Sequence, residues 1–461
     1  MRKKVLLIGL LISPFLVFAQ ESQVLNLNIQ QAQEYALEHN KTLKNSKVDV
    51  DIAKKQLWQA ISQGLPQVSG TVDYTNYFNY SMEFSMGGDS EVPDISGIPG
   101  IDAGDVILFN MLMESLTGGS GTAIKMKHTS NATLQVSQLI FSGQYIAGIQ
   151  LSKINQILVD MSLEKSEIDI LESVTNTYYM SLITDKSMEI IDANIENLDQ
   201  TLKQTQALLN AGMIEETDVD QIKMSITMLE NSKRSLQRNA ELNNNLMKFQ
   251  LGLDNDVELI LSENYDGVFN SINFMNILNV EFNPNENIDM RLLSTQEELS
   301  HKMLAMERWT YAPTLAGAYN HTEKLLTTGF DMNPKNLFTF NLSIPILSSG
   351  QRKANVEQKK LELIKVQNSK EIVNDQLLMQ EKQLRFNLTS ALEGYQSQKA
   401  NVDLARKIYN NTELKFRQGV ASSFDLIQAN SNLLQAENNY ISSGMELLQA
   451  KLAFDKLFNK I

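Results

Sequence analysis

The chain has 461 residues, contains no cysteine, and carries 54 acidic against 40 basic side chains, for a formal net charge of −14. Without cysteine it forms no disulfide, and its acidic balance makes nucleic acid and anionic lipid surfaces poor binding partners. Its four histidines stand in no catalytic or metal-ligating motif, and no phosphate-binding loop is present. We therefore expect no enzyme, and no catalytic, cofactor-binding or metal site.

Residues 1–19 have the features of a secretory signal peptide. Three basic residues follow Met1, an apolar run extends to Phe18, and the small residue Ala19 ends it. The run is too short for a membrane-spanning helix and ends in a cleavage pattern. We expect it to be removed on export, and the loss of its basic residues takes the net charge from −14 to −17.

The rest of the chain is an internal duplication. The stretch GMIEETDVDQ, which begins at Gly212, returns at Gly419 as GVASSFDLIQ. The matched residues, each pair 207 positions apart, are Gly212 with Gly419, Asp218 with Asp425, Gln221 with Gln428, and Gly143 with Gly350. Pro66 and Pro313 match at a spacing of 247 residues, so the first copy holds 40 extra residues between Pro66 and Gly143. We divide the chain into a first repeat (20–252), a connecting segment (253–286) and a second repeat (287–461).

Each repeat reads as a helix, a proline, two strands, a long helix, a glycine turn and a second helix. Proline is absent from residues 100–283 and 346–461, and apolar residues recur there at steps of three and four. This pattern predicts amphipathic helices that form coiled coils. The expected helices cover residues 143–211, 218–250, 350–418 and 425–458. A helix of about 69 residues spans roughly 100 Å, which no ordinary globular domain needs.

Between each proline and the following long helix, the hydrophobic period changes to two. The expected strands cover residues about 67–82, 130–141, 314–323 and 337–347. Their length suits tilted strands that cross a membrane, and the alternative is a soluble four-stranded sheet with one buried face. Four strands cannot close a transmembrane barrel, so a membrane role requires several copies, and three would supply twelve strands. The extra residues of the first repeat, about 83–129, suit a long exterior loop.

The acidic residues after each glycine turn allow two compatible interpretations. Asp218 with Gln221, and Asp425 with Gln428, resemble capping boxes with Asp as the N-cap and Gln at N3, after a glycine that suits a left-handed helix end. The other interpretation is a constriction at which carboxylates from several copies meet, raise one another's pKa and attract cations.

The order and spacing of several segments resemble those of the TolC-like outer-membrane efflux proteins, the exit ducts of tripartite pumps and of type I secretion. The segments of the first repeat are LNIQQAQEYALEHNKTLKNSKVDVDIAKKQL, LPQVSG and QVSQLIFSGQ. Those of the second are APTLAG, LSIPILSSGQ and RQGVASSFDLIQANSNLLQAENNY. Each segment is degenerate alone, but their order, duplication and spacing make the resemblance specific.

The resemblance implies a mainly α fold with a β-barrel part, assembled as a homotrimer in the outer membrane of a Gram-negative cell. A long α-barrel would cross the periplasm, and each chain would contribute four strands to a twelve-stranded barrel. A smaller mixed region would draw on residues 253–286 and both termini. The implied partners are outer-membrane lipid, a periplasmic adaptor (membrane fusion protein) and an inner-membrane pump, with no nucleic acid. The alternative function is a non-conducting coiled-coil scaffold or adhesin on the cell surface.

The resemblance also places the two glycine turns at the periplasmic tip, where this family docks its adaptor and closes an aperture. The implied docking turns are Gly212 and Gly419, and the implied aperture residues are Thr217, Asp218, Asp425 and Gln428. Gln428 stands where the family's latch has a second aspartate, and Ala421 where it has an arginine. We therefore expect an aperture held by contacts other than that salt bridge.

Overall fold

The computed structural model describes residues 24–78, 81–84, 93–96, 98, 102–117, 122–125, 128–327 and 334–461. The expected signal peptide lies outside these residues. The chain forms two compact units. Unit 1 consists of the described residues up to Ala53 with Asn155–Glu298 and Ile364–Ile461, and unit 2 consists of Lys54–Ile154 and Leu299–Leu363. Each unit therefore draws on both sequence repeats.

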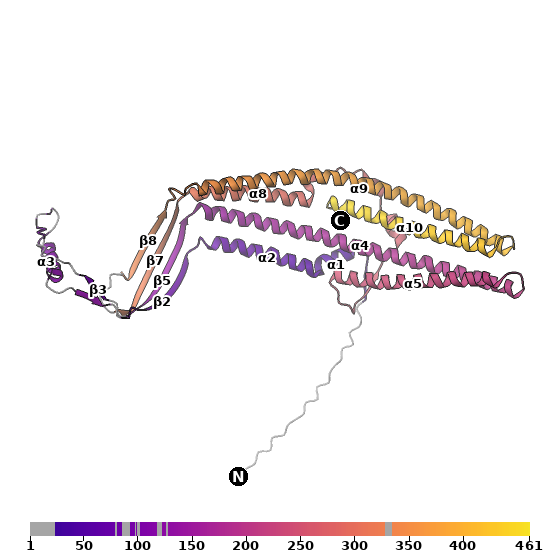
Figure 1. The fold of residues 1–461 in the computed structure, drawn as a ribbon, viewed down its shortest axis with the longest axis horizontal. Coiled ribbons are helices and arrows are strands. Elements are labelled where there is room, and N and C mark those ends of the chain that lie inside the picture. Colours follow the sequence, from indigo (N-terminus) through magenta and orange to yellow (C-terminus); the bar gives the residue numbers. More distant parts are fainter. Residues whose placement is uncertain are drawn as a thin grey trace, which may run out of the picture. The chain divides into compact units, whose positions relative to one another are not determined.

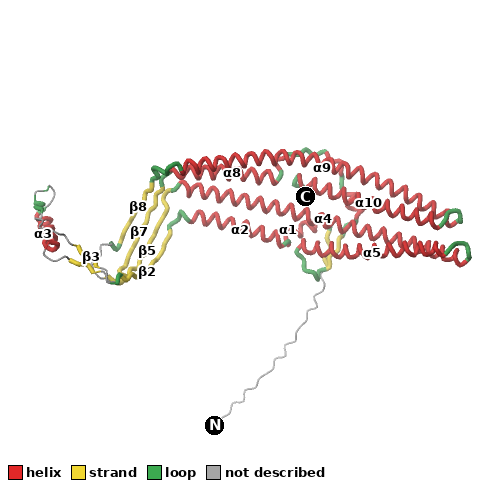
Figure 2. The backbone as a smooth tube through the Cα atoms, in the orientation of Figure 1, coloured by secondary structure: helices red, strands yellow, loops and turns green. Residues whose placement is uncertain are grey.

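Unit 2 contains a four-stranded sheet (Figure 2), and its neighbouring strands run antiparallel. In order across the sheet, its strands are β2 (Gln67–Asn76), β5 (His128–Phe141), β7 (Thr314–Thr327) and β8 (Asn336–Ser343). One row across all four strands consists of Val68, Val136, Tyr319 and Phe338. The row beside it consists of Gln67, Ser137, Ala318 and Thr339. Since successive residues of a strand point to opposite faces, this register gives one apolar and one largely polar face.

The described residues leave the outer strands of this sheet uncovered. Every residue of β2 and of β8 is exposed, including Val68 at 66% and Phe338 at 59%. A soluble four-stranded sheet would bury its apolar face, so that alternative does not describe this sheet. Two open edge strands and an exposed apolar face are typical of a surface that a partner covers.

Two of the expected strands end earlier than the sequence pattern suggested. β2 stops at Asn76, whose side chain accepts a hydrogen bond from the backbone N–H of Phe78 at 2.8 Å, and Phe78 has a φ of +51°. This turn breaks the extended backbone before residue 82. β8 ends at Ser343 rather than at 347, because Pro345 has no N–H to continue a ladder. β7, in contrast, continues past the expected residue 323 to Thr327.

The 40 extra residues of the first repeat contain secondary structure that we did not predict. A short strand, β3 (Ser81–Phe84), pairs antiparallel with β4 (Thr122–Lys125). The helix α3 (Ala103–Thr117) lies between them in the chain. We expected a loop because the stretch as a whole is rich in Gly, Asp and Ser. The segment VILFNMLM of this helix is apolar on nearly every side, so no helical period marks it.

The long helices form two hairpins (Figure 1). In chain order, the principal helices are α1 (Ile29–His39), α2 (Lys41–Ser62), α4 (Gly143–Asn210), α5 (Glu216–Leu251), α8 (Ile288–Arg308), α9 (Gln351–Arg417) and α10 (Ser423–Leu457). α4 with α5 forms the hairpin of the first repeat, and α9 with α10 forms that of the second. In the part of the chain that the structure describes, no helix combines the length and the apolar character needed to cross a membrane.

Unit 1 also contains a smaller mixed region beside the helices. Its elements are β1 (Val24–Leu27), β6 (Glu258–Leu261), α6 (Tyr265–Ser271), α7 (Phe274–Leu278) and a 3₁₀ turn (Pro284–Glu286); a second 3₁₀ turn, Trp309–Tyr311, belongs to unit 2. β1 and β6 pair in parallel. The hydroxyl of Tyr178, a fully buried residue of α4, donates to the carbonyl of Leu27 at 3.3 Å. Two four-residue strands are too short to be stable alone, so this packing on α4 holds them.

An aromatic cluster holds α6 against α9 and α10. The hydroxyls of Tyr395 and Tyr440 lie 2.8 Å apart, and Phe269 stacks on Tyr395 with ring centres 4.7 Å apart. Tyr265 is buried beside them. Gly444 of α10 leaves space for the Tyr265 ring, because a Cβ at position 444 would meet the Tyr265 hydroxyl.

We expect Gly444→Ala to lower the free energy of unfolding by about 1–3 kcal/mol, because the added methyl group overpacks the buried cluster. The matched control is Gly394→Ala in α9, where a Cβ would meet no atom within 4 Å. That control should instead stabilise the helix by about 0.5–1 kcal/mol. Thermal denaturation followed by circular dichroism compares the two variants. Equal melting temperatures would show that the cluster accommodates the methyl group.

Candidate functional site

The two glycine turns have the same backbone geometry. Gly212 and Gly419 have φ angles of +70° and +74°. In each turn the glycine N–H donates to the carbonyl of the residue three positions before the glycine. The N–H of the residue after the glycine donates to the carbonyl of the residue five positions before that one. This is a Schellman motif, whose left-handed residue is usually glycine because a Cβ would be strained there. The predicted left-handed helix end is therefore confirmed at both turns.

The aspartates after the turns occupy a different capping position from the one we predicted. Asp218 and Asp425 are the third residues of α5 and α10, while Glu215 and Ser422 are the N-caps. The Asp425 carboxylate accepts the Ser422 N–H at 3.0 Å, and the Ser422 hydroxyl accepts the Asp425 N–H at 3.1 Å. The Glu215 N–H donates to Asp218 at 3.3 Å.

The prediction of Asp as N-cap with Gln at N3 was therefore wrong by three residues. An acidic side chain can serve at either end of a capping box, as N-cap or as the N3 residue that reaches back. Only the backbone path into the helix distinguishes the two positions. The helices α5 and α10 consequently begin at Glu216 and Ser423, two residues earlier than expected.

A hydrogen bond joins the two turns, which lie at the same end of their hairpins (Figure 1). The hydroxyl of Ser423, at the start of α10, donates to one carboxylate oxygen of Asp218, near the start of α5. Ser423 is buried and Asp218 is half-buried. Because the other Asp218 oxygen accepts the Glu215 N–H, both oxygens of this carboxylate are engaged. The N-termini of the two hairpins' second helices are thus tied to each other within one chain.

Apolar side chains pack the hairpins together behind this hydrogen bond. Within the second hairpin, buried Tyr409 and Phe416 of α9 pack with Leu426 of α10, and Leu208 of α4 joins them. Within the first, buried Ile191, Leu198, Ile222 and Leu229 are joined by Ile427 and Leu434 of α10. Ala421 is half-buried against the Tyr409 cluster, so the position where the family has an arginine faces apolar side chains here.

The remaining aperture candidates are exposed, and each is hydrogen-bonded within its own helix end. The Thr217 hydroxyl donates to the Glu215 carboxylate at 3.3 Å. The Gln428 amide donates to Asn432 at 3.0 Å, one turn further along α10. Of the four candidates, only Asp218 is therefore brought to the other hairpin. Its partner, Ser423, was not among the candidates, because no motif marks a contact between residues 205 positions apart.

The charge on the two turns is unequal. Glu215, Glu216 and Asp220 are exposed at the first turn, and Asp220 pairs with Lys223 at 3.1 Å. At the second turn, hydrogen bonds from the Ser422 backbone and hydroxyl hold the pKa of Asp425 below its ordinary value. Asp425 therefore stays ionised at neutral pH in a single chain. This shift is opposite in direction to the one that repulsion in a ring of carboxylates would cause.

Both turns also present apolar side chains to solvent. Met213 is 71% exposed and Val420 is 74% exposed, each directly after its glycine, and Phe424 is exposed on the first turn of α10. In many Schellman motifs the residue after the glycine packs back on the helix. These side chains are instead exposed to solvent.

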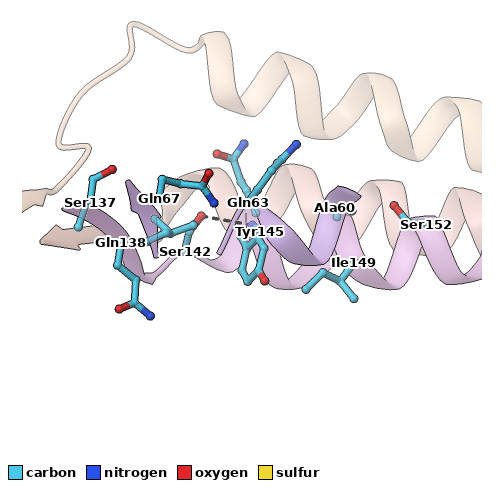
Figure 3. Close-up of a pocket in the computed structure, with 13 residues that line it drawn as sticks. Ala60, Gln63, Gln67, Ser137, Gln138, Ser142, Tyr145, Ile149 and Ser152 are labelled. Atoms are coloured by element: carbon cyan, nitrogen blue, oxygen red, sulfur yellow. Dashed lines mark hydrogen bonds between the residues drawn. The ribbon is translucent and has the colours of Figure 1, made fainter. Parts of the chain in front are cut away.

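A cavity of about 650 Å³ lies in unit 2 where the strands β2 and β5 meet α2 and α4 (Figure 3). Its lining includes Gln63, Gln67, Gln138 and Ser152 but no charged side chain. The Tyr145 hydroxyl donates to the carbonyl of Ile61 at 2.8 Å and fixes the ring there. The cavity offers hydrogen bonds but no acid–base pair. Among the described residues, no group of three or more His, Asp or Glu side chains is placed to hold a metal ion.

Comparison with known proteins gives one family and several relatives. A family model described as "Outer membrane efflux protein" matches residues 32–245 and 287–460. The outer membrane protein TolC of Salmonella enteritidis is 21% identical over 453 residues, which cover 94% of this chain and 81% of that protein.

Solved structures with the same fold include two bacterial outer membrane proteins. VceC of Vibrio cholerae matches with a TM-score of 0.68 at 12% identity, covering 93% of this chain and 95% of that one. The CmeC outer membrane channel of Campylobacter jejuni matches with a TM-score of 0.69 at 14% identity, covering 94% and 86%. Since the family model spans both repeats, including the long helices and both glycine turns, the chain belongs to the outer membrane efflux protein family.

Proposed function

We propose that three copies of this chain close into a twelve-stranded barrel in the outer membrane and form the passive exit duct of a tripartite efflux or type I secretion system. The observation that carries the proposal is the sheet of unit 2, whose edge strands β2 and β8 are open and whose apolar face is exposed. Lipid tolerates no open edge, so the edges must pair with those of other copies.

The two faces of the sheet fit the two surfaces of such a barrel. The apolar face, with Val68 and Phe338, would meet lipid, and the polar face, with Ser137 and Thr339, would line a water-filled channel. Thr133 and Thr322 face each other on the polar side with their hydroxyls 3.1 Å apart. A channel lined in this way binds no particular solute tightly, which suits a duct whose cargo is selected elsewhere.

The glycine turns would form the periplasmic aperture and the docking surface for an adaptor. The exposed apolar side chains of Met213, Val420 and Phe424 are suited to contact a partner's helical hairpin. The hydrogen bond between Ser423 and Asp218 would hold the two hairpins of each chain together and keep the aperture narrow. This contact takes the place of the salt-bridge latch that Ala421 and Gln428 cannot form. An inner-membrane pump, reached through the adaptor, would supply the energy.

Membrane fractionation tests the proposal as a whole. The protein should be recovered with the outer membrane and should migrate as a trimer on gels unless it is heated, as stable barrels do. The purified protein should then conduct ions in planar bilayers. Recovery in the soluble fraction, or a monomer that never conducts, would reject the channel and favour a surface scaffold.

The acidic turns lead to a prediction about ion selectivity. Replacing both Asp218 and Asp425 by Asn removes six carboxylates from a trimeric aperture, so cation preference should fall, as measured by the reversal potential in a salt gradient. The matched control is Asp403→Asn, an exposed acid about 24 Å along α9 from Gly419 at 1.5 Å per residue. An anion-selective wild type, or equal shifts in both variants, would contradict a charge ring at the turns.

A further inference from the structure

The helix α3 has no role in the duct described so far. It lies on the connection that leaves β2 at Asn76 and returns to β5 at His128, at the end of the sheet opposite α2 and α4. Its first turn is well capped: the Asp105 N–H donates to the Asp102 side chain at 2.9 Å, and the Asp102 N–H donates to Asp105 at 3.2 Å. The reciprocal bonds of this capping box define a stable helix start.

The apolar side chains of α3 are not covered by the described residues of this chain. Ile107, Leu108 and Met111 are 61%, 71% and 66% exposed. Ile107 and Met111 lie one turn apart on one face, and Leu108 lies about 100° around the helix from Ile107. A helix that is apolar on several sides is normally buried among other helices. An exposed apolar area of this kind is typical of a surface that a partner covers.

Lipid does not fit this helix. Its 15 residues are about 22 Å long, which is shorter than the roughly 30 Å hydrocarbon core of a bilayer. Residues 102–117 include acidic residues but no Lys or Arg, whereas helices that lie on membrane surfaces carry basic residues on a polar face. The acidic residues flank the apolar run 106–113, in which the only polar residue is Asn110.

Copies of α3 from the other chains of the trimer are the partner that suits the position and the size of this helix. β2 is an edge strand, so barrel closure places β8 of the next copy beside it and repeats the α3 connection around one axis. A twelve-stranded barrel, with strands about 4.8 Å apart and tilted by about 40°, has a backbone diameter of about 24 Å. Three packed helices, each about 10 Å thick, measure about 22 Å across. Three copies of α3 can therefore cover the barrel end.

The structure thus points to a cap: we infer that the three α3 helices of the assembled protein pack on one another over the end of the barrel at which β2 ends and β5 begins. This inference rests on the proposed function, since it requires the trimer. Asn110, the polar residue within the apolar run, would face its own copies near the three-fold axis. A single polar residue at such a position sets the number and register of the associating helices. The cap restricts the mouth of the duct independently of the periplasmic turns.

Disulfide cross-linking tests the cap cleanly, because the chain has no cysteine of its own. Ile107→Cys introduces one thiol per chain into the exposed face of α3 in the full-length protein, about 60° around the helix from Asn110. Mild oxidation of outer membranes should then yield a disulfide-linked dimer as the main species, since packed helices bring neighbouring thiols to the Cβ separation of about 4 Å that a disulfide needs. One chain in each trimer must stay unlinked, because a disulfide joins only two.

The matched control is Ser96→Cys, which places an exposed thiol on the same connection outside α3. Equal dimer yields for Ile107→Cys and Ser96→Cys would overturn the cap. So would cross-links from Ile107→Cys to a protein of another size, or quenching of a fluorophore on its thiol by spin-labelled lipid. Trimer migration and bilayer conductance are measured on the same samples. If these succeed and the cross-link fails, only the cap is rejected; if they fail, the proposed channel itself is rejected.

Discussion

A channel carrying Ser423→Ala is expected to pass more current in its resting state than the wild-type channel. The substitution removes the hydroxyl that donates to Asp218 and leaves a carboxylate oxygen of that half-buried residue without its donor. A hydrogen bond to a charged group is worth about 1.5–3 kcal/mol. Its loss shifts the equilibrium between closed and open turns toward the open form by about 10-fold or more in each chain. Single-channel recording in planar bilayers measures this shift as a higher resting conductance.

The neighbouring serine supplies the control for this prediction. Ser422→Ala removes the N-cap of the same helix and should cost about 0.5–2 kcal/mol of helix stability while leaving the Ser423–Asp218 bond in place. It should therefore lower the melting temperature without raising the resting conductance. A double-mutant cycle with Asp218→Asn completes the test, because residues in direct contact give non-additive effects. A Ser423→Ala channel that conducts like Ser422→Ala would refute the latch.

The second large effect is expected at the glycine that ends α5. Gly252 has a φ of +72°, and a Cβ there would lie 2.5 Å from the backbone carbonyl oxygen of His39. Backbone atoms cannot rotate away as a side chain can, so Gly252→Ala must displace the junction between α1 and α2. We expect a loss of about 1–2 kcal/mol for the left-handed backbone and about 1–3 kcal/mol more for the overpacking.

Gly212→Ala separates these two contributions. Gly212 has nearly the same φ, +70°, but a Cβ there would meet no atom within 4 Å. This control should show the backbone strain alone, so the difference in unfolding free energy between the two variants isolates the contact with His39. Chemical denaturation in detergent, followed by circular dichroism, measures both. Equal destabilisation by the two substitutions would mean that the junction at His39 moves freely.

The long helices and the sheet could be predicted because their signals are local and repeated. Apolar side chains at three- and four-residue steps define the buried stripe of α4 and α9, and alternation from Val68 to Tyr74 defines the two faces of β2. Glycine at 212 and 419 marks the helix ends, since few other residues tolerate a positive φ. The spacing of 207 residues between these glycines showed that both hairpins have one design.

Other elements had signals that sequence reasoning could not resolve. The apolar run of α3 has no polar side to set a period, so helix and loop could not be told apart. Asp218 and Asp425 fit either end of a capping box, and only the observed start of each helix identified them as N3 residues. The parallel pairing of β1 with β6 joins segments more than 230 residues apart, and no local pattern predicts such a contact.

The sequence by itself determined the duplicated architecture, the two glycine turns, the two-faced strands and, through the order of its segments, the family. These properties depend on residue types at fixed local spacing, which act before the chain folds. Only the tertiary structure decided how the turns are held. Ser423 and Asp218 are ordinary residues in sequence, and their hydrogen bond exists because packing of Leu208, Ile427 and Leu434 brings two hairpins together.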